Sequence, residues 1–584
     1  MNGLLLQLAR SGDITWLSFY FAEFIAQQSD SNIDDWPALT AAMLSQESQS
    51  GSACIDLKTY CGEPIFSSRL VSMNDIPKGP DFDRWGKLLH ASRCVDSPAG
   101  TTPIILDGHR LYLSRLWKYE DLIAEKIKLR LNRDATLVNS DNVGLQSELF
   151  PEGSDDQDQQ LAIELATSHY FNVISGGPGS GKTTTVIKIL CRLLGAEPSI
   201  RIAMAAPTGK AATRMMESIA SGLARIDNSD AVRQAIPTTA STIHRLLDYR
   251  HHRYHYNRGN LLPVDCVVID EASMIDLSLM YQLLDAIADD TRLILLGDRD
   301  QLSSVSAGNV LGDITGHGYA QTDSGTSIAK SIALLRHSYR FSDSSAIAAL
   351  AKSVNRGQSS DSLELLRNAD NELVWYEHDG EQLSPKLVDT ILENFQPVFD
   401  SRSAAEAIIA FEKCRVLCAT NIGPLGVVQI NELISRRMLL RNQLAEREIF
   451  RGMPIMITRN QHQMGLYNGD TGIIWEQDDH QLQACFYNYQ NGEIRHFPLN
   501  RLPGYKLAWA TTVHKSQGSE FETVYLVLPS DQNSSVLSRE LIYTAITRSK
   551  NHFFLQASEG VLTSAIENLT RRHSGLAAKL GWTR

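Results

Sequence analysis

One segment limits what this chain can fold into more than any other: GGPGSGKT, at residues 176–183. An apolar run, FNVIS, comes directly before it, and a stretch at helical spacing, TTTVIKILCRLL, begins with its last residue. Glycines let backbone N–H groups approach phosphates, and the N-terminal end of the following helix favours negative charge. We therefore expect a buried strand, a phosphate-binding loop and a helix, which together bind a nucleoside triphosphate.

Two side chains of this loop carry specific chemistry. Lys182 should reach the β- and γ-phosphates, and the hydroxyl of Thr183 should bind Mg²⁺. The nucleotide-binding residues expected from the whole loop are Gly176, Gly177, Pro178, Gly179, Ser180, Gly181, Lys182, Thr183 and Thr184.

A pair of carboxylates, Asp270 and Glu271, follows the apolar run CVVI. Side chains at the carboxyl end of a buried parallel strand lie beside the phosphates in sheets of this kind. Asp270 suits the Mg²⁺ shell, and Glu271 suits the base that orients or deprotonates water. An ordinary acidic turn is the alternative, which the pair alone would favour and the upstream loop disfavours.

The apolar runs predict an α/β chain of several units. Seven runs suit buried strands of two parallel sheets. They lie at 171–175, 201–206, 266–270 and 292–297 for the first sheet, and at 415–420, 523–529 and 552–558 for the second. Short runs between 453 and 497, separated by Asn-Gly and Asp-rich turns, indicate a small β-barrel inserted into the second unit. The first 120 residues are apolar at helical spacing, and an acidic linker follows at 151–160.

Composition narrows the class of protein. The formal net charge of −12 argues against a surface coated with nucleic-acid contacts, although a narrow basic channel remains compatible with it. No uninterrupted apolar run reaches about 18 residues, so we expect no membrane span. The eight cysteines are scattered without a tight CxxC pair, so zinc, iron–sulfur and disulfide sites are disfavoured and a cytoplasmic location is expected.

Six further segments accompany the loop and the acid pair in a fixed order. They are APTGKAA (206–212), STIHRLL (241–247), GDRDQLSSV (297–305), SYRF (338–341), TTVHKSQGSEF (511–521) and YTAITRSK (543–550). These segments resemble motifs Ia, Ib, III, IV, V and VI of superfamily 1B DNA helicases. The resemblance covers roughly residues 155–584. With a looser match at 110–127, it is strongest to the RecD family, the alpha subunits of RecBCD enzymes (exonuclease V).

The resemblance implies more residues for the nucleotide site. Gln301 would contact the γ-phosphate, while Arg340 and Arg548 would enter the cleft from the second core and stabilise the transferring phosphoryl group. Gln159 would read the adenine, and Glu520 would lie near the ribose. For either arginine the alternative is a surface salt bridge, worth about 1 kcal/mol or less.

The resemblance also implies a track for single-stranded DNA. Its expected residues are Pro207, Thr208, Lys210, Thr242, His244, Thr512 and His514. These should touch mostly phosphate and sugar, so no sequence specificity is expected. A buried structural histidine is the alternative for His244. The segment RHHRYHYNRGNLL (250–262) is either a β-hairpin wedge or a solvated loop.

The implied architecture consists of two RecA-like motor domains behind an N-terminal helical domain. We expect residues 1–120 to form a partner-docking domain. Residues 121–345 would form the first motor domain, with a hairpin insert near 248–263, and 346–584 the second, with the barrel near 451–505. The family further implies a 5′→3′ motor that uses ATP and Mg²⁺ and works with RecB-like and RecC-like subunits on broken duplex ends. A free-standing RecD-like helicase, an ATP-binding regulatory subunit and an RNA helicase remain open as alternatives.

Overall fold

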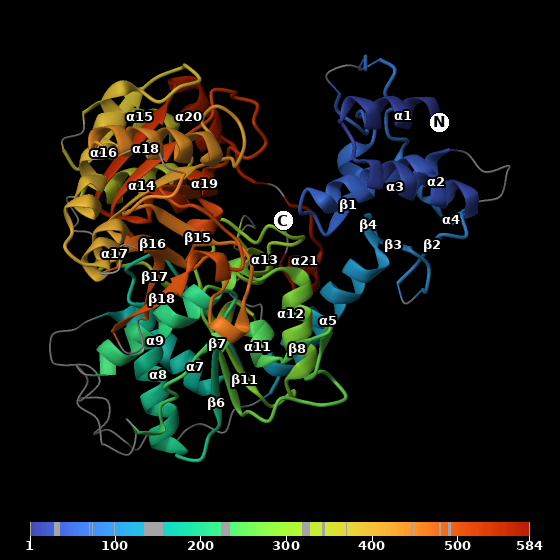
Figure 1. Ribbon diagram of the computed structural model, residues 1–584. Coiled ribbons are helices and arrows are strands. Elements are labelled where there is room, and N and C mark those ends of the chain that lie inside the picture. The colour runs from blue at the N-terminus through green and yellow to red at the C-terminus, as the bar shows by residue number, and fades with distance from the viewer. Residues whose placement is uncertain are drawn as a thin grey trace.

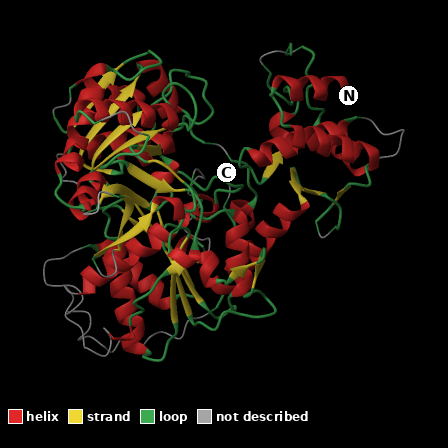
Figure 2. Cartoon of the chain, viewed as in Figure 1, coloured by secondary structure: helices red, strands yellow, loops and turns green. Residues whose placement is uncertain are grey.

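The structure is a computed structural model that describes residues 2–28, 35–68, 71–72, 74–98, 100–133, 156–223, 234–317, 328–340, 345–368, 371–444, 448–477, 481–488, 492–570 and 572–582. These residues form an α/β protein with two parallel sheets (Figures 1 and 2). We call the body around each parallel sheet the first core and the second core. In Figure 1 the N-terminal body, in blue, lies to one side of both cores and is joined to the first core by helix α5. It also contacts that core directly, because Gly308 N donates to the carbonyl of Gly51 at 2.9 Å.

The first core is built on a six-stranded sheet of order β12-β5-β11-β10-β6-β7, with every pairing parallel. Four strands coincide with the predicted runs, whereas the short edge strands β7 and β12 were not predicted. The strands are β5 (Phe171–Gly176), β6 (Ile202–Ala206), β7 (Ser241–Thr242), β10 (Cys266–Ile269), β11 (Arg292–Gly297) and β12 (Ile332–Leu335). The helices are α5 (Ser114–Leu131), α7 (Gln157–Ser168), α8 (Lys182–Ala196), α9 (Gly209–Leu223), α11 (Ile243–Leu246), α12 (Leu277–Ala286) and α13 (Val310–Ile314).

Separate apolar clusters cover the two faces of this sheet. Helices α7, α8 and α9 pack on one face, and α5, α12 and α13 pack on the other. A strand with helices on both faces is apolar at most positions, which fits the burial of β10 and β11 along their whole length. The charged exception is Arg292, the first residue of β11.

The second core repeats this plan with a sheet of order β13-β22-β21-β14-β20. Its strands are β13 (Leu373–Glu377), β14 (Cys414–Cys418), β20 (Ala510–Thr512), β21 (Phe521–Val527) and β22 (Ser549–Ala557). Its helices are α14 (Ala346–Asn355), α15 (Ser359–Arg367), α16 (Pro385–Asp400), α17 (Ala404–Glu412), α18 (Val427–Arg441), α19 (Arg539–Ile546) and α20 (Glu559–Glu567). The prediction of two parallel-sheet cores is confirmed.

The inserted unit is a sheet, and the barrel predicted for it is not confirmed. Its order is β18-β17-β16-β15-β19, with all pairings antiparallel. No pairing between the outer strands β18 and β19 occurs among the described residues, so the sheet stays open. The strands are β15 (Pro454–Ile457), β16 (Thr471–Glu476), β17 (Leu482–Asn488), β18 (Glu493–Pro498) and β19 (Tyr505–Leu507). Strands β15, β16 and β17 share an apolar cluster with the second core.

The N-terminal body is helical, as predicted, but it also contains a small sheet. The helices are α1 (Asn2–Ser11), α2 (Trp16–Gln28), α3 (Trp36–Gln49) and α4 (Phe82–His90). The sheet has the order β1-β4-β3-β2, with β1 (Cys54–Asp56), β2 (Val95–Asp96), β3 (Ile104–Asp107) and β4 (Arg110–Leu113). Strands of two to four residues are too short for periodicity to reveal. In the described part of the chain, no helix combines the length and apolar character that a membrane crossing requires.

Two predicted domain boundaries need correction. The boundary at 120/121 falls inside α5, which is continuous from residue 114 to 131. The last residues, assigned to the second motor domain, return to the first core: α21 (Leu576–Lys579) packs there, and Trp582 Nε1 donates to the carbonyl of Ile314 at 3.1 Å. The buried carboxylate of Glu120 anchors this return by accepting from Ser574 and from Gly575 N. Residues 151–155 of the acidic linker lie outside the described residues, and residues 157–160 form the start of α7. Phe341 of the SYRF motif also lies outside the described residues.

Candidate active site

The phosphate-binding loop connects β5 to α8, as the sequence predicts. Gly179 and Gly181 have φ of 78° and 82°, a left-handed conformation that glycine adopts without strain. A Cβ on Gly179 would also lie 2.4 Å from the Cβ of Arg340. Both the backbone conformation and this close approach therefore require glycine at position 179. Lys182 Nζ donates to the carbonyls of Gly176 at 2.5 Å and Gly177 at 3.1 Å, which places the ammonium inside the loop.

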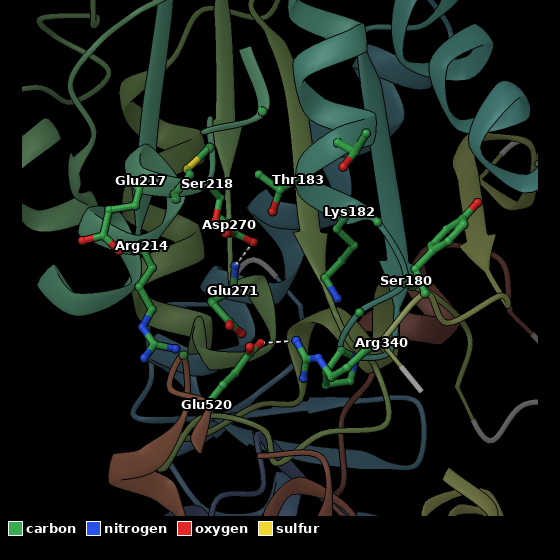
Figure 3. Close-up of a pocket in the computed structure, with 18 of the residues that line it drawn as sticks. Ser180, Lys182, Thr183, Arg214, Glu217, Ser218, Asp270, Glu271, Arg340 and Glu520 are labelled. Carbon is green, nitrogen blue, oxygen red and sulfur yellow. Dashed lines mark hydrogen bonds and ion pairs between the residues drawn. The ribbon is translucent and has the colours of Figure 1, made fainter. Parts of the chain in front are cut away.

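The carboxylate pair lies beside this loop. The N–H of Glu271 donates to Asp270 Oδ1 at 2.8 Å. Burial, together with the charge of Glu271, raises the pKa of Asp270 to about 6, against the opposing effect of Lys182. Glu271 has φ of 52°, a left-handed conformation that costs a residue with a side chain about 1 kcal/mol or more. Figure 3 shows Lys182, Thr183 and both carboxylates converging on one cleft.

The segment after β11 joins the two cores at this cleft. The buried carboxylate of Asp298 accepts from Gln301 Nε2 at 2.9 Å in its own segment and from Tyr543 Oη at 3.1 Å on α19 of the second core. Burial, with the nearby Asp300, raises the pKa of Asp298 to about 6. Sequence reasoning missed Asp298 and Tyr543, although both stand inside motifs it had identified.

A backbone group of the same segment makes two more contacts across the cores. Leu302 N donates to Thr544 Oγ1 at 2.9 Å, and its carbonyl accepts from Gln517 Nε2 at 2.7 Å. Both hydrogen bonds are buried, so they lie in the interface between the two cores and away from water. The relative position of the two cores is therefore coupled to the segment that carries Gln301.

The two predicted arginines line the same cleft but come from different cores. Arg548 is buried beside α19, where Nη1 donates to the carbonyl of Ser519 at 3.1 Å. Arg340 was expected from the second core. That expectation is wrong, because Arg340 follows β12, the last strand of the first sheet. Its neighbour Tyr339 donates its N–H to the carbonyl of Gly179 at 2.8 Å, which ties this segment to the loop.

The cleft has a volume of about 890 Å³ and brings most of the predicted nucleotide residues together. Gln159 and Glu520 line the cleft together with the loop from Pro178 to Thr184. Gly176 and Gly177 are not among the lining residues, but their carbonyls accept from Lys182.

Several residues that line the cleft were not predicted, because no motif assigns them a role. They are Asp156, Lys188, Arg214, Met215, Glu217, Ser218, Ser221, Gly222, Tyr339, Gly518 and Lys550, with Ala211 at the start of α9.

The predicted DNA-contact residues lie at the carboxyl ends of strands at or next to one edge of each sheet. Pro207, Thr208 and Lys210 follow β6, and Thr242 and His244 lie at the end of the neighbouring edge strand β7. Thr512 ends the edge strand β20, and His514 follows it. The three threonine hydroxyls accept from backbone N–H groups three residues on, at 3.2 Å, 3.2 Å and 3.3 Å. Each hydroxyl therefore shapes its own turn and keeps a proton to donate.

The segment after α11 forms a short aromatic β-hairpin, so the hairpin expected there is present, and its role as a wedge stays a prediction. Its strands, β8 (Tyr249–Arg250) and β9 (Arg253–Tyr254), have two residues each. The ring of His244 is exposed and lies 5.7 Å from that of Tyr249 and 6.1 Å from that of Tyr254. The alternative of a buried structural histidine is therefore wrong for this residue.

Among the described residues, no group of three or more histidine, cysteine, aspartate or glutamate side chains is arranged to hold a metal on its own. Two parallel sheets, a phosphate-binding loop on one and a buried arginine of the other in the same cleft define the class of nucleotide-driven motors built from two RecA-like cores.

The chain is 34% identical over 575 residues to the RecBCD enzyme subunit RecD of Mycolicibacterium smegmatis, with 95% of each chain covered. It belongs to the RecD family. The subunit RecD of Haemophilus influenzae is 33% identical, over 96% of this chain and 97% of that one. The ATP-dependent RecD2 DNA helicase of Deinococcus radiodurans is 28% identical, over 79% of this chain but 57% of its own.

Three families match parts of the chain. They are the N-terminal domain of RecBCD enzyme subunit RecD over residues 10–112, an AAA domain over 159–307 and a UvrD-like helicase C-terminal domain over 507–555. A solved structure of Pif1 helicases on forked duplex DNA covers 69% of this chain and 91% of its own, with 17% identity and a TM-score of 0.38.

We predict that Gly179→Ala lowers ATP hydrolysis at least about tenfold, because the left-handed backbone and the Arg340 side chain both oppose a Cβ there. Steady-state hydrolysis with saturating single-stranded DNA measures this. Gly86→Ala in α4, where a Cβ would meet nothing within 4 Å, is the control and should match the parent chain. Wild-type kinetics in Gly179→Ala would contradict the geometry.

Proposed function

We propose that the chain is the ATP-dependent 5′→3′ DNA helicase subunit of a RecBCD-type helicase-nuclease, which processes double-strand DNA ends for recombinational repair in the cytoplasm. The observation that carries this proposal is the single cleft lined by the loop of the first core and by Arg548 and Glu520 of the second. A cleft completed by both cores makes hydrolysis depend on their relative position, and this dependence is what a translocating motor needs.

The side chains of the cleft fit a nucleotide with Mg²⁺. Ser180 Oγ and Gln301 Oε1 are buried without a hydrogen-bond partner in the described part of the chain, so both suit a polar ligand. Thr183 and Asp270 would hold Mg²⁺, which neutralises phosphate charge when bound. Glu271 would take the proton of the attacking water on its carboxylate, and Lys182, Arg340 and Arg548 would stabilise the phosphoryl group.

Single-stranded DNA would cross the carboxyl ends of β6, β7 and β20. Threonine hydroxyls, Lys210 and the exposed rings of His244 and Tyr249 offer the donors, the cation and the stacking surfaces that such tracks use. Most of these groups suit phosphate and sugar, which supports binding without sequence preference.

Two other functions compete with this one. A free-standing RecD-like helicase is less favoured, because the chain spans about the full length of RecD relatives but 57% of the RecD2 helicase. A regulatory subunit that binds ATP without translocating is less favoured, because Glu271, Gln301 and Arg548 all line the cleft.

The proposal predicts strand separation on a duplex with a 5′ single-stranded tail and none on a duplex with a 3′ tail. The chain is assayed with ATP and Mg²⁺, alone and with RecB-like and RecC-like subunits. Lys182→Gln, which removes the ammonium from the loop, should abolish opening.

Opening of the 3′-tailed duplex would refute the polarity. Hydrolysis of ATP without strand opening, even with the partners present, would favour the regulatory subunit. Opening by the chain alone, without any increase from the partners, would favour the free-standing helicase.

Helix α2 supports a role for the N-terminal body in docking a RecC-like subunit. Trp16, Leu17, Tyr20 and Phe24 are 46%, 63%, 59% and 47% exposed on this helix. Contiguous exposed apolar side chains of this kind mark protein interaction sites. The body contains none of the predicted catalytic residues, so a binding role suits it better than a chemical one.

We predict that Leu17→Asp combined with Tyr20→Asp weakens binding to the RecC-like subunit at least about tenfold, because charge replaces exposed apolar contacts. DNA-dependent ATP hydrolysis by the isolated chain should not change. Gln7→Asp, at an exposed polar position of α1, is the matched control. Undiminished co-purification of the double variant would remove α2 from the interface.

Lys210 gives the DNA track a pH dependence. Burial and the nearby charges of Arg214 and Arg415 lower the pKa of Lys210 to about 7. A lysine with a lowered pKa is charged below that pH and neutral above it. Its contribution to phosphate binding is therefore present at pH 6 and lost by pH 8.

We predict that affinity for an oligothymidine falls roughly fivefold more between pH 6 and pH 8 in the parent chain than in Lys210→Arg, which stays charged throughout. Lys210→Gln should bind weakly at both values. Fluorescence anisotropy measures the affinity, and equal pH dependence in all three chains would exclude Lys210 from the track.

A further inference from the structure

The strongest charged contact in the cleft joins the two cores through Arg340 and Glu520. Arg340 Nη2 donates to a carboxylate oxygen of Glu520. Arg340 follows β12 of the first sheet, and Glu520 directly precedes β21 of the second. Their side chains are 16% and 29% exposed, so water screens the pair less than a surface ion pair. Figure 3 shows this contact as a dashed line across the cleft.

Glu520 neutralises more than one cation. Lys550 Nζ lies 3.5 Å from its second oxygen, and Arg548 and Arg214 line the same cleft. Burial acts to raise the pKa of Glu520, but the positive charges of Arg340, Lys550 and Arg548 outweigh it and hold the pKa below its usual value. The carboxylate is therefore ionised and is the negative group to which these cations are drawn.

Arg340 is within reach of the phosphate-binding loop without any movement of its backbone. Its Cβ is the atom that a Cβ on Gly179 would meet at 2.4 Å, and its neighbour Tyr339 is hydrogen-bonded to the carbonyl of Gly179. Rotation of the side chain alone can move the guanidinium between Glu520 and the loop. A guanidinium binds carboxylate and phosphate oxygens with the same planar fork, so either can hold it.

We propose that Glu520 competes with the terminal phosphates of the nucleotide for Arg340, and so holds this arginine back until a triphosphate draws it away. This inference rests on the proposed function, since it concerns the same nucleotide site. It makes Glu520 a positioning residue that acts through Arg340, in addition to the ribose contact that the family resemblance implies.

The exchange has a mechanical consequence. While Arg340 is paired with Glu520, the last strand of the first sheet is linked to the motif V segment of the second. When phosphate takes Arg340, that link is lost and the carboxylate becomes free to accept from another group. Nucleotide binding would thus replace one contact between the cores by others, which is how binding energy can be converted into relative movement.

The test uses inorganic triphosphate with Mg²⁺, because this ligand has neither the sugar nor the base. Its Kd for the full chain is measured by titration calorimetry in the parent, in Glu520→Gln and in Glu217→Gln. Glu217 lines the same cleft, and among the described residues the ion pair of Arg340 is with Glu520 and not with Glu217. The Glu217→Gln variant therefore measures the general effect of removing one negative charge. Glu520→Gln should bind about fivefold more tightly than Glu217→Gln.

A second pair of chains tests whether the effect acts through Arg340. In the background of Arg340→Ala, Glu520→Gln should bind triphosphate no better than Glu217→Gln does. Unchanged or weaker binding in Glu520→Gln, or a gain that persists without Arg340, overturns the proposal. If the parent chain hydrolyses ATP and opens 5′-tailed duplexes in either of those cases, the competition alone is wrong. A parent chain that neither binds triphosphate nor hydrolyses ATP would overturn the proposed function as well.

Discussion

The buried carboxylate of Asp298 is the contact on which the arrangement of the cleft depends. It accepts one hydrogen bond from Gln301 in its own segment and another from Tyr543 on α19, so one side chain orients a residue of the first core against the second. Its other oxygen accepts from Asp300 N at 3.1 Å. A buried carboxylate without partners would be costly in free energy, so these three donors stabilise it. The backbone of Leu302 adds two more hydrogen bonds between the cores, to Thr544 and from Gln517. The geometry of both cores around the nucleotide site follows from these few contacts.

Charge in this molecule is local. The chain carries a formal net charge of −12, yet six cations line the one cleft that also holds the phosphate-binding loop: Lys182, Lys188, Arg214, Arg340, Arg548 and Lys550. Phosphate recognition depends on the nearest few side chains, because water and salt screen charges beyond about 10 Å. The overall negative charge and the basic cleft are therefore compatible. Glu520 lies among these cations and forms an ion pair with Arg340. The position of the Arg340 guanidinium therefore depends on whether this ion pair is formed.

Sequence reasoning succeeded where chemistry is carried by short contiguous segments. The loop at 176–183 and the acid pair after β10 were predictable from their residue types and spacing. Most of the central strands of both sheets were predictable, because a strand covered on both faces is mainly apolar. It failed where the outcome depended on distant partners. Arg340 was assigned to the wrong core, the inserted sheet was expected to close, and the last residues were placed in the second core although Trp582 packs on the first.

The sequence by itself determined the class of chemistry and the family, because glycines at Gly179 and Gly181, a lysine at Lys182 and carboxylates after a buried strand have few other uses in that order. The tertiary structure decided which groups meet. The pairing of Arg340 with Glu520, the bridge from Asp298 to Tyr543 and the return of the C-terminal segment to Glu120 join residues that are 180, 245 and 454 positions apart. No local pattern encodes such contacts, since the first two exist only where the two cores meet and the third only when the end of the chain packs against α5.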